Sequence, residues 1–139
     1  MDSTWPIEVV DLDAFLTKAG FTCRRCEKFQ DFNNKLVQYD NTSIGIRITS
    51  DRGLWIVAVS EVINQPSQWY DIALIRDFII GTGRNVLTLA EQIQILEINW
   101  QLIVNCFNAA RKEDTHARLA ILREKRLKRL FPNLHRRTA

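Results

Sequence analysis

Residues 44–59 read IGIRITSDRGLWIVAV, and the spacing of their apolar residues indicates two successive β-strands. Ile44, Ile46 and Ile48 alternate with polar or small residues, a period that is typical of a strand with one buried face. Residues 50–53 are turn formers. The run 54–59 is apolar throughout, as expected of a strand in the centre of a sheet. The stretch therefore predicts a hairpin around which the rest of the fold is arranged.

Two further strands are predicted before this hairpin, at residues 21–28 and 35–39, with a polar loop between them. The four strands together predict an antiparallel meander. A short helix is predicted at residues 11–19, ahead of the strands. Asp11 is its expected N-cap, because a carboxylate there accepts from the free N–H groups of the first turn. Gly20 follows at the position where a helix commonly ends.

The chain after Pro66 has helical periodicity and predicts three helices, at residues 67–80, 89–108 and 115–131. The second is expected to begin with a capping box formed by Thr88 and Glu91, and its wide apolar face predicts a central position. The third has a narrow apolar stripe and is expected at the periphery. Because the strands are grouped before the helices, the sequence predicts an α+β fold whose three C-terminal helices pack on one sheet face. A single domain over residues 1–139 is expected.

The formal net charge of +3 is unevenly distributed along the chain. Residues 1–110 carry 9 Lys/Arg and 13 Asp/Glu, whereas residues 111–139 carry 10 Lys/Arg and 3 Asp/Glu. The basic helix and tail at 111–139 have two interpretations, a solvated face of a peripheral helix and a weak contact for nucleic acid. In the second interpretation the candidate phosphate-binding residues are Arg123, Lys125, Arg126, Lys128 and Arg129.

The sequence also gives expectations about the compartment. No stretch approaches the ~20 consecutive apolar residues that a membrane-spanning helix needs. The first residues, MDSTWPIEVV, lack the basic and apolar parts of a secretory signal. Three cysteines do not suggest the disulfide framework of a small secreted protein. We therefore expect a cytoplasmic protein without membrane contact.

Motifs for catalysis or for metal binding are weak in this chain. Cys23 and Cys26 have CxxC spacing, but a zinc site needs four ligands and no second pair follows. On a regular strand their offset of three places the two sulfurs on opposite faces. The glycines of residues 81–83 follow a helix, whereas a dinucleotide-binding loop follows a strand. No GxSxG elbow occurs, and His116 and His135 lie in the basic segment. The sequence predicts a non-enzymatic protein with no metal and no cofactor.

Three short stretches carry a resemblance to known proteins. They are Val37-Gln-Tyr39, the sequence IRITSDRGLW at residues 46–55, and Trp69-Tyr-Asp-Ile-Ala-Leu74. This pattern, over residues 35–80, resembles small bacterial α+β proteins, some of which are similar to the immunity proteins of polymorphic toxin systems. The resemblance implies a protein that binds and blocks a partner toxin in a stoichiometric complex. It assigns a functional role to no individual residue.

Aromatic and charged side chains are the usual anchors of tight protein interfaces. Trp69 and Tyr70 are therefore candidate contacts, and their burial over the sheet is the competing interpretation. The exposure of Trp5, near the start of the chain, is equally open. If the partner is a nuclease with a basic site, acidic residues are natural contacts through electrostatic complementarity. The acidic candidates are Asp71, Asp77, Glu91 and Glu97.

The function predicted from the sequence is a protein-binding module of the immunity type. A nucleic-acid-associated accessory protein that uses the basic segment is the alternative. The apolar faces of the helices at 67–80 and 89–108 also leave a homodimer open.

Overall fold

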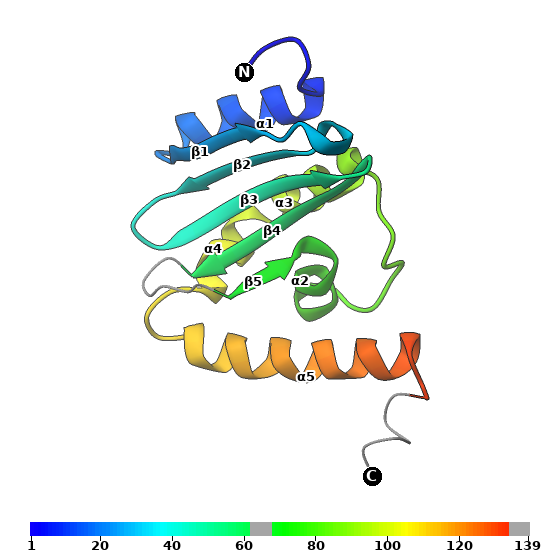
Figure 1. Ribbon diagram of the computed structural model, residues 1–139. Coiled ribbons are helices and arrows are strands. Elements are labelled where there is room, and N and C mark those ends of the chain that lie inside the picture. Colours follow the sequence, from blue (N-terminus) through cyan, green and yellow to red (C-terminus); the bar gives the residue numbers. More distant parts are fainter. Residues whose placement is uncertain (62–67, 134–139) are drawn as a thin grey trace.

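The computed structural model describes residues 1–61 and 68–133, and Figure 1 shows how their elements are arranged. The helices are α1 (Ile7–Lys18), α2 (Ile72–Ile79), α3 (Leu89–Ile98), α4 (Trp100–Cys106) and α5 (Lys112–Leu130). The strands are β1 (Thr22–Lys28), β2 (Lys35–Asp40), β3 (Ile44–Asp51), β4 (Leu54–Glu61) and β5 (Trp69–Asp71), and a 3-10 turn spans Asp31–Asn33. The predicted α+β class is confirmed. Of the helices in the described residues, none has the length and apolar content to cross a bilayer.

The strands form one antiparallel sheet in the order β1-β2-β3-β4-β5. The four predicted strands are present as consecutive neighbours, and in the central hairpin Ile46 lies opposite Val59 and Ile48 lies opposite Val57. Its turn places Arg52 and Gly53 at φ values of 53° and 82°. Two consecutive positive φ values are typical of a type I′ hairpin turn, whose twist matches the right-handed twist of the strands.

Strand β5 was not expected, since the sequence predicts helix from residue 67. Residues 69–71 instead pair with residues 58–60 of β4. The Asp71 side chain accepts a hydrogen bond from the backbone N–H of Leu74 at 3.2 Å, which caps α2 and makes the helix begin at Ile72. Residue 67 itself lies outside the described residues.

Other helix boundaries also differ from the prediction. Helix α1 begins at Ile7, directly after Pro6, so Asp11 lies inside the helix and is not its N-cap. The helix expected at 89–108 is interrupted at Asn99, whose side-chain amide donates to the Ile95 carbonyl at 2.9 Å. Such a local bond offers the backbone an alternative to continuing the helix. Helix α5 begins at Lys112, and the tail residues 134–139 lie outside the described part.

The hydrophobic core lies between one face of the sheet and helices α1, α2, α3 and α4. Figure 1 shows α3 and α4 behind the strands and α1 along the β1 side of the sheet. Its fully buried members include Leu12, Leu16, Ile46, Ile48, Val57, Val59, Leu96 and Ile103. Trp5 is 5% exposed and its ring lies 6.4 Å from that of Trp55, so it belongs to the core. Helix α5 runs along the β5 side of the molecule and packs against α2 (Figure 1). The expectation that all three C-terminal helices cover the sheet face is therefore correct only in part.

The opposite sheet face, which we call the open face, is crossed by no described helix in Figure 1. A row of cross-strand neighbours runs over it from β1 to β5, namely Arg25, Gln38, Arg47, Ala58 and Asp71. These residues alternate along their strands with the core residues and therefore point away from the core. The open face is the part of the sheet that is accessible to another molecule.

Candidate functional site

Trp69 lies against the open face and not in the core. A Cβ atom at Gly45 would come within 3.0 Å of the Trp69 ring, so glycine allows the ring to lie on strand β3. The guanidinium carbon of Arg47 lies 4.5 Å from the ring centroid, in a cation–π contact. The Trp69 side chain is half-buried, so part of it remains accessible. Trp69 therefore remains a candidate contact.

Tyr70, the next residue, points to the other side of the sheet and is 1% exposed. Its hydroxyl lies 2.5 Å from Nδ1 of His116, and Nε2 of His116 lies 2.7 Å from Oε2 of Glu61. His116 was expected on a solvated helix face, but it links α5 to two strands. The burial of Tyr70 agrees with the competing interpretation, in which this ring packs against the sheet and is not exposed to a partner.

Tyr70, His116 and Glu61 form a series of hydrogen-bonded side chains that resembles a catalytic triad of nucleophile, base and carboxylate. Burial raises the pKa of the Tyr70 phenol, which opposes its activation as a nucleophile. The hydrogen bond from His116, assisted by Lys112 at 3.1 Å, lowers the pKa of Glu61. The chain therefore serves to fasten α5 to β4 and β5.

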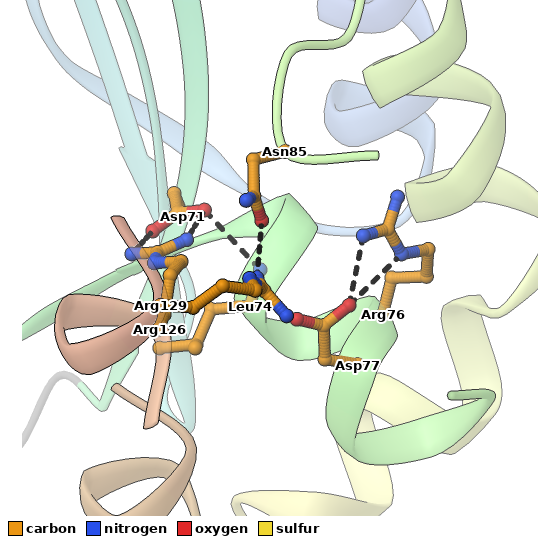
Figure 2. A network of polar contacts seen from close by, with 7 residues as sticks. All are labelled: Asp71, Leu74, Arg76, Asp77, Asn85, Arg126 and Arg129. Atoms are coloured by element: carbon orange, nitrogen blue, oxygen red, sulfur yellow. Dashed lines mark hydrogen bonds and ion pairs between the residues drawn. The ribbon is translucent and has the colours of Figure 1, made fainter. Parts of the chain in front are cut away.

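Figure 2 shows the polar network where α5 meets α2 and β5. Arg126 donates to both carboxylate oxygens of Asp71, at 2.9 and 2.7 Å. Burial alone would raise the pKa of Asp71, but the hydrogen bonds and the positive charge of Arg126 outweigh it and hold the pKa below its usual value. Asp71, a predicted protein contact, and Arg126, a predicted phosphate contact, are thus paired with each other. Neither is free in this structure for the role that the sequence suggested.

Asp77 is also committed inside the molecule. It accepts from the neighbouring Arg76 at 2.8 Å, and its side chain is 5% exposed. Figure 2 also shows Arg129, which donates to Asn85 at 3.3 Å and ties the end of α5 to the loop before α3. The Asp77 carboxylate is therefore paired with Arg76 and has little exposed surface for the partner contact that the sequence suggested.

The other basic candidates on α5 differ in whether they contact the rest of the molecule. Arg123 donates to the backbone carbonyl of Trp69 at 3.0 Å and lies over the Tyr70 ring, with 4.9 Å between guanidinium carbon and centroid. Lys125 and Lys128 are exposed. Two of the five predicted phosphate-binding residues, Arg123 and Arg126, thus hold α5 against the sheet edge.

The two acidic candidates on α3 differ in their surroundings. Glu91 forms the predicted capping box with Thr88, with both bonds at 3.1 Å, and it also pairs with Arg84. Glu97 is exposed on the outer side of α3. Of the four acidic candidates, Glu97 is the one that is exposed.

A pocket of about 270 Å³ lies at the end of the open face, between β4, the loop at residues 85–87 and α5. Leu54, Ile56 and Val86 line it, although they are 57%, 41% and 79% exposed. The Asp71–Arg126 pair forms another part of its wall. The pocket therefore presents accessible apolar side chains beside a neutralised charge pair.

One wall of this pocket depends on Gln92, which is 6% exposed. Strand β5 ends opposite residue 58, so the edge of β4 is without a strand partner beyond that point. The Gln92 Oε1 accepts from the Val57 N–H at 2.8 Å, and its Nε2 donates to the carbonyls of Trp55 at 2.8 Å and Leu87 at 3.1 Å. The side-chain amide thus replaces the peptide group of a neighbouring strand. In the sequence, the signal for this role is that Gln92 is a polar residue on the apolar stripe of the helix predicted at residues 89–108.

The cysteine pair is arranged differently from the prediction. A β-bulge between Cys23 and Arg25 adds a residue, so Cys23 lies opposite Tyr39 and Cys26 lies opposite Val37. Both cysteines therefore share the face of Tyr39 and Val37 and do not lie on opposite faces. Within residues 1–61 and 68–133, no group of three or more His, Cys, Asp or Glu is placed to hold a metal ion.

No protein-family model matches this chain, and no curated protein or solved structure shows significant similarity to it.

Acidification is expected to destabilise the fold through Glu61 and Asp71. Both carboxyl pKa values are lowered in the folded state. Their contribution is therefore complete above the unfolded values of about 4 and is lost as the pH falls through the lower folded values. Urea unfolding between pH 7 and pH 3 should show a plateau and then a fall below about pH 4. Glu61→Gln should have a shallower fall, and an unchanged slope in that variant would contradict the assignment.

Proposed function

We propose that this protein is a non-enzymatic protein-binding module of the immunity type, which neutralises a partner toxin by stoichiometric binding. The observation that carries the proposal is the convergence of Leu54, Ile56 and Val86 on one pocket at the end of the open face. Each of these side chains is more than 40% exposed. Apolar side chains gathered at a concave, accessible site are typical of a place where a partner inserts an anchor residue.

The charge distribution supports binding more than catalysis. The Tyr70–His116–Glu61 chain has its phenol buried and its phenol pKa raised. The Asp71–Arg126 pair in the pocket wall is mutually neutralised. Such groups stabilise a preformed surface, and a preformed surface loses less conformational entropy on binding. The toxin as the class of partner follows from the resemblance over residues 35–80.

The proposal is tested by capture from the native host with the tagged full-length chain, with and without nuclease treatment, read by mass spectrometry. One stoichiometric protein that survives nuclease is expected. Val86→Asp should weaken its retention roughly tenfold or more, because a charge would be buried without a partner.

The matched control is Ile7→Asp, which places the same charge at an exposed apolar residue on α1. It should retain the partner at the wild-type level, and thermal melts should show both variants folded. Equal retention by Val86→Asp would remove the pocket from the interface. Loss of all captured protein on nuclease treatment would instead favour the nucleic-acid alternative, with Lys125 and Lys128 as its exposed basic residues.

A further inference from the structure

Arg47 occupies the centre of the open face. It lies on β3, the middle strand of the sheet, between Gln38 of β2 and Ala58 of β4. Its side chain is half-buried by these neighbours and by Trp69. Ala58, the cross-strand neighbour of Arg47, lies two residues along β4 from Ile56, which lines the pocket. The pocket and Arg47 are therefore parts of one continuous surface.

The surroundings of Arg47 differ from those of most other arginines in the described chain. Arg24, Arg25, Arg52, Arg76, Arg84, Arg118 and Arg126 each have a carboxylate within ion-pair distance. No hydrogen bond or ion pair joins Arg47 to any residue within 1–61 and 68–133, and its Nε is buried without a hydrogen-bond acceptor. A buried polar group without a partner is unfavourable in the free protein. The Arg47 side chain as a whole is only half-buried, so a ligand that binds the accessible side of its guanidinium would supply a negative charge that no described residue provides.

The Arg47 guanidinium is positioned by its contact with Trp69. It stacks on Trp69 at 4.5 Å, and Trp69 is itself placed by the glycine beneath its ring at residue 45 and by Arg123, which binds its carbonyl. The planar guanidinium of an arginine presents a fork of N–H donors that matches the two oxygens of a carboxylate. Burial, together with the nearby charge of Arg25, lowers the pKa of Arg47, in agreement with an uncompensated cation.

We propose that the Arg47–Trp69 stack is a carboxylate-recognition site, which receives an acidic side chain from a segment of the partner protein that docks on the open face. The proposal rests on the proposed function for the class of partner. The sequence suggested that acidic residues of this protein contact a basic partner. The proposal assigns the opposite charges, because Asp71 and Asp77 are paired with arginines whereas Arg47 has no carboxylate partner among the described residues. An apolar residue of the same segment enters the pocket beside Ile56.

The site is tested without the natural partner by NMR on the full-length protein. The probes are an acetylated tetraglutamate peptide, a tetralysine peptide and an oligothymidylate. Tetraglutamate should shift the Nε–H signal of Arg47 and the indole N–H of Trp69 saturably, with a Kd on the order of millimolar. Arg47→Met should abolish the response of the Trp69 indole N–H, which is the signal that this variant retains.

Arg52→Met is the matched control, because Arg52 also stacks on an aromatic ring, that of Phe32 at 4.9 Å, but lies in an exposed turn. This variant should keep the tetraglutamate response at Arg47. The absence of a saturable shift, or an equal response to tetralysine, would overturn the proposal. A response to oligothymidylate alone would also overturn it and would assign the stack to phosphate.

Capture experiments separate the two proposals. Arg47→Met should retain the captured partner about 30-fold less well than the wild type, as expected when one member of a desolvated charge pair is removed. If the wild-type protein captures a partner and Arg47→Met captures it equally, the carboxylate site is wrong and the binding function stands. If the wild type captures no partner but tetraglutamate still shifts Arg47, the binding function fails and the carboxylate site stands.

Discussion

Gln92→Met is expected to lower the free energy of unfolding by about 3 kcal/mol, because it leaves buried backbone groups without partners. Methionine has a similar length and fills the same space, so little packing is lost. The Val57 N–H and the Trp55 carbonyl would lose their bonds to the amide at the edge of β4, and Leu87 would lose its bond as well. Urea unfolding at pH 7 measures the change.

The matched control is Gln94→Met, since Gln94 lies on the same helix but is exposed. It should change the stability by less than about 0.5 kcal/mol. Hydrogen exchange adds a local measurement, because the Val57 amide should exchange faster in Gln92→Met than in Gln94→Met. Equal stabilities of the two variants would show that the side-chain amide does not complete the sheet edge.

Asp71→Ala is expected to cost about 3 kcal/mol, because it removes two functions at once. The carboxylate caps α2 at Leu74 and binds Arg126 at both oxygens, and both ionic side chains are less than one third exposed. The variant leaves the Arg126 charge without its partner near the pocket. Thermal and urea unfolding of Asp71→Ala, Arg126→Met and the double variant measure the pair through a double-mutant cycle.

The coupling energy in this cycle should exceed about 1 kcal/mol. The exposed pair Asp114–Arg118, one turn apart on α5, provides the comparison and should give less than about 0.5 kcal/mol. Asp71→Asn should fall between the wild type and Asp71→Ala, because an asparagine still caps the helix. A coupling near zero for Asp71–Arg126 would mean that this pair does not hold α5 against β5.

The sequence was informative where the signal is local. The alternation at residues 44–48 and the turn at 50–53 predict a hairpin that is present, and the capping box of Thr88 and Glu91 forms as expected. Helix and strand periodicity depend on neighbours a few residues apart, and the chain carries those neighbours in order. Strand β5 was missed because its three residues are too few to show the alternation of a strand. The apolar residues that follow it directly in α2 have helical spacing, so the prediction extended the helix over β5.

The candidate site depends on contacts between distant residues. Asp71 was predicted to contact a partner and Arg126 to contact phosphate, but folding brings them together across 55 residues. Tyr70 and His116 are likewise joined across 46 residues. Charge and aromatic content alone do not show which side chains will satisfy one another.

The sequence by itself determined the α+β class, the central hairpin and the positions of most elements, because these follow from short-range periodicity and turn chemistry. Only the tertiary structure decided that Trp69 lies on the open face while Tyr70 is buried, and that Gln92 completes the edge of β4. It also decided that Arg47 has no carboxylate partner among the described residues. The physical reason is that burial and ionic pairing depend on distances between segments, and these are fixed only when the sheet edge and α5 meet.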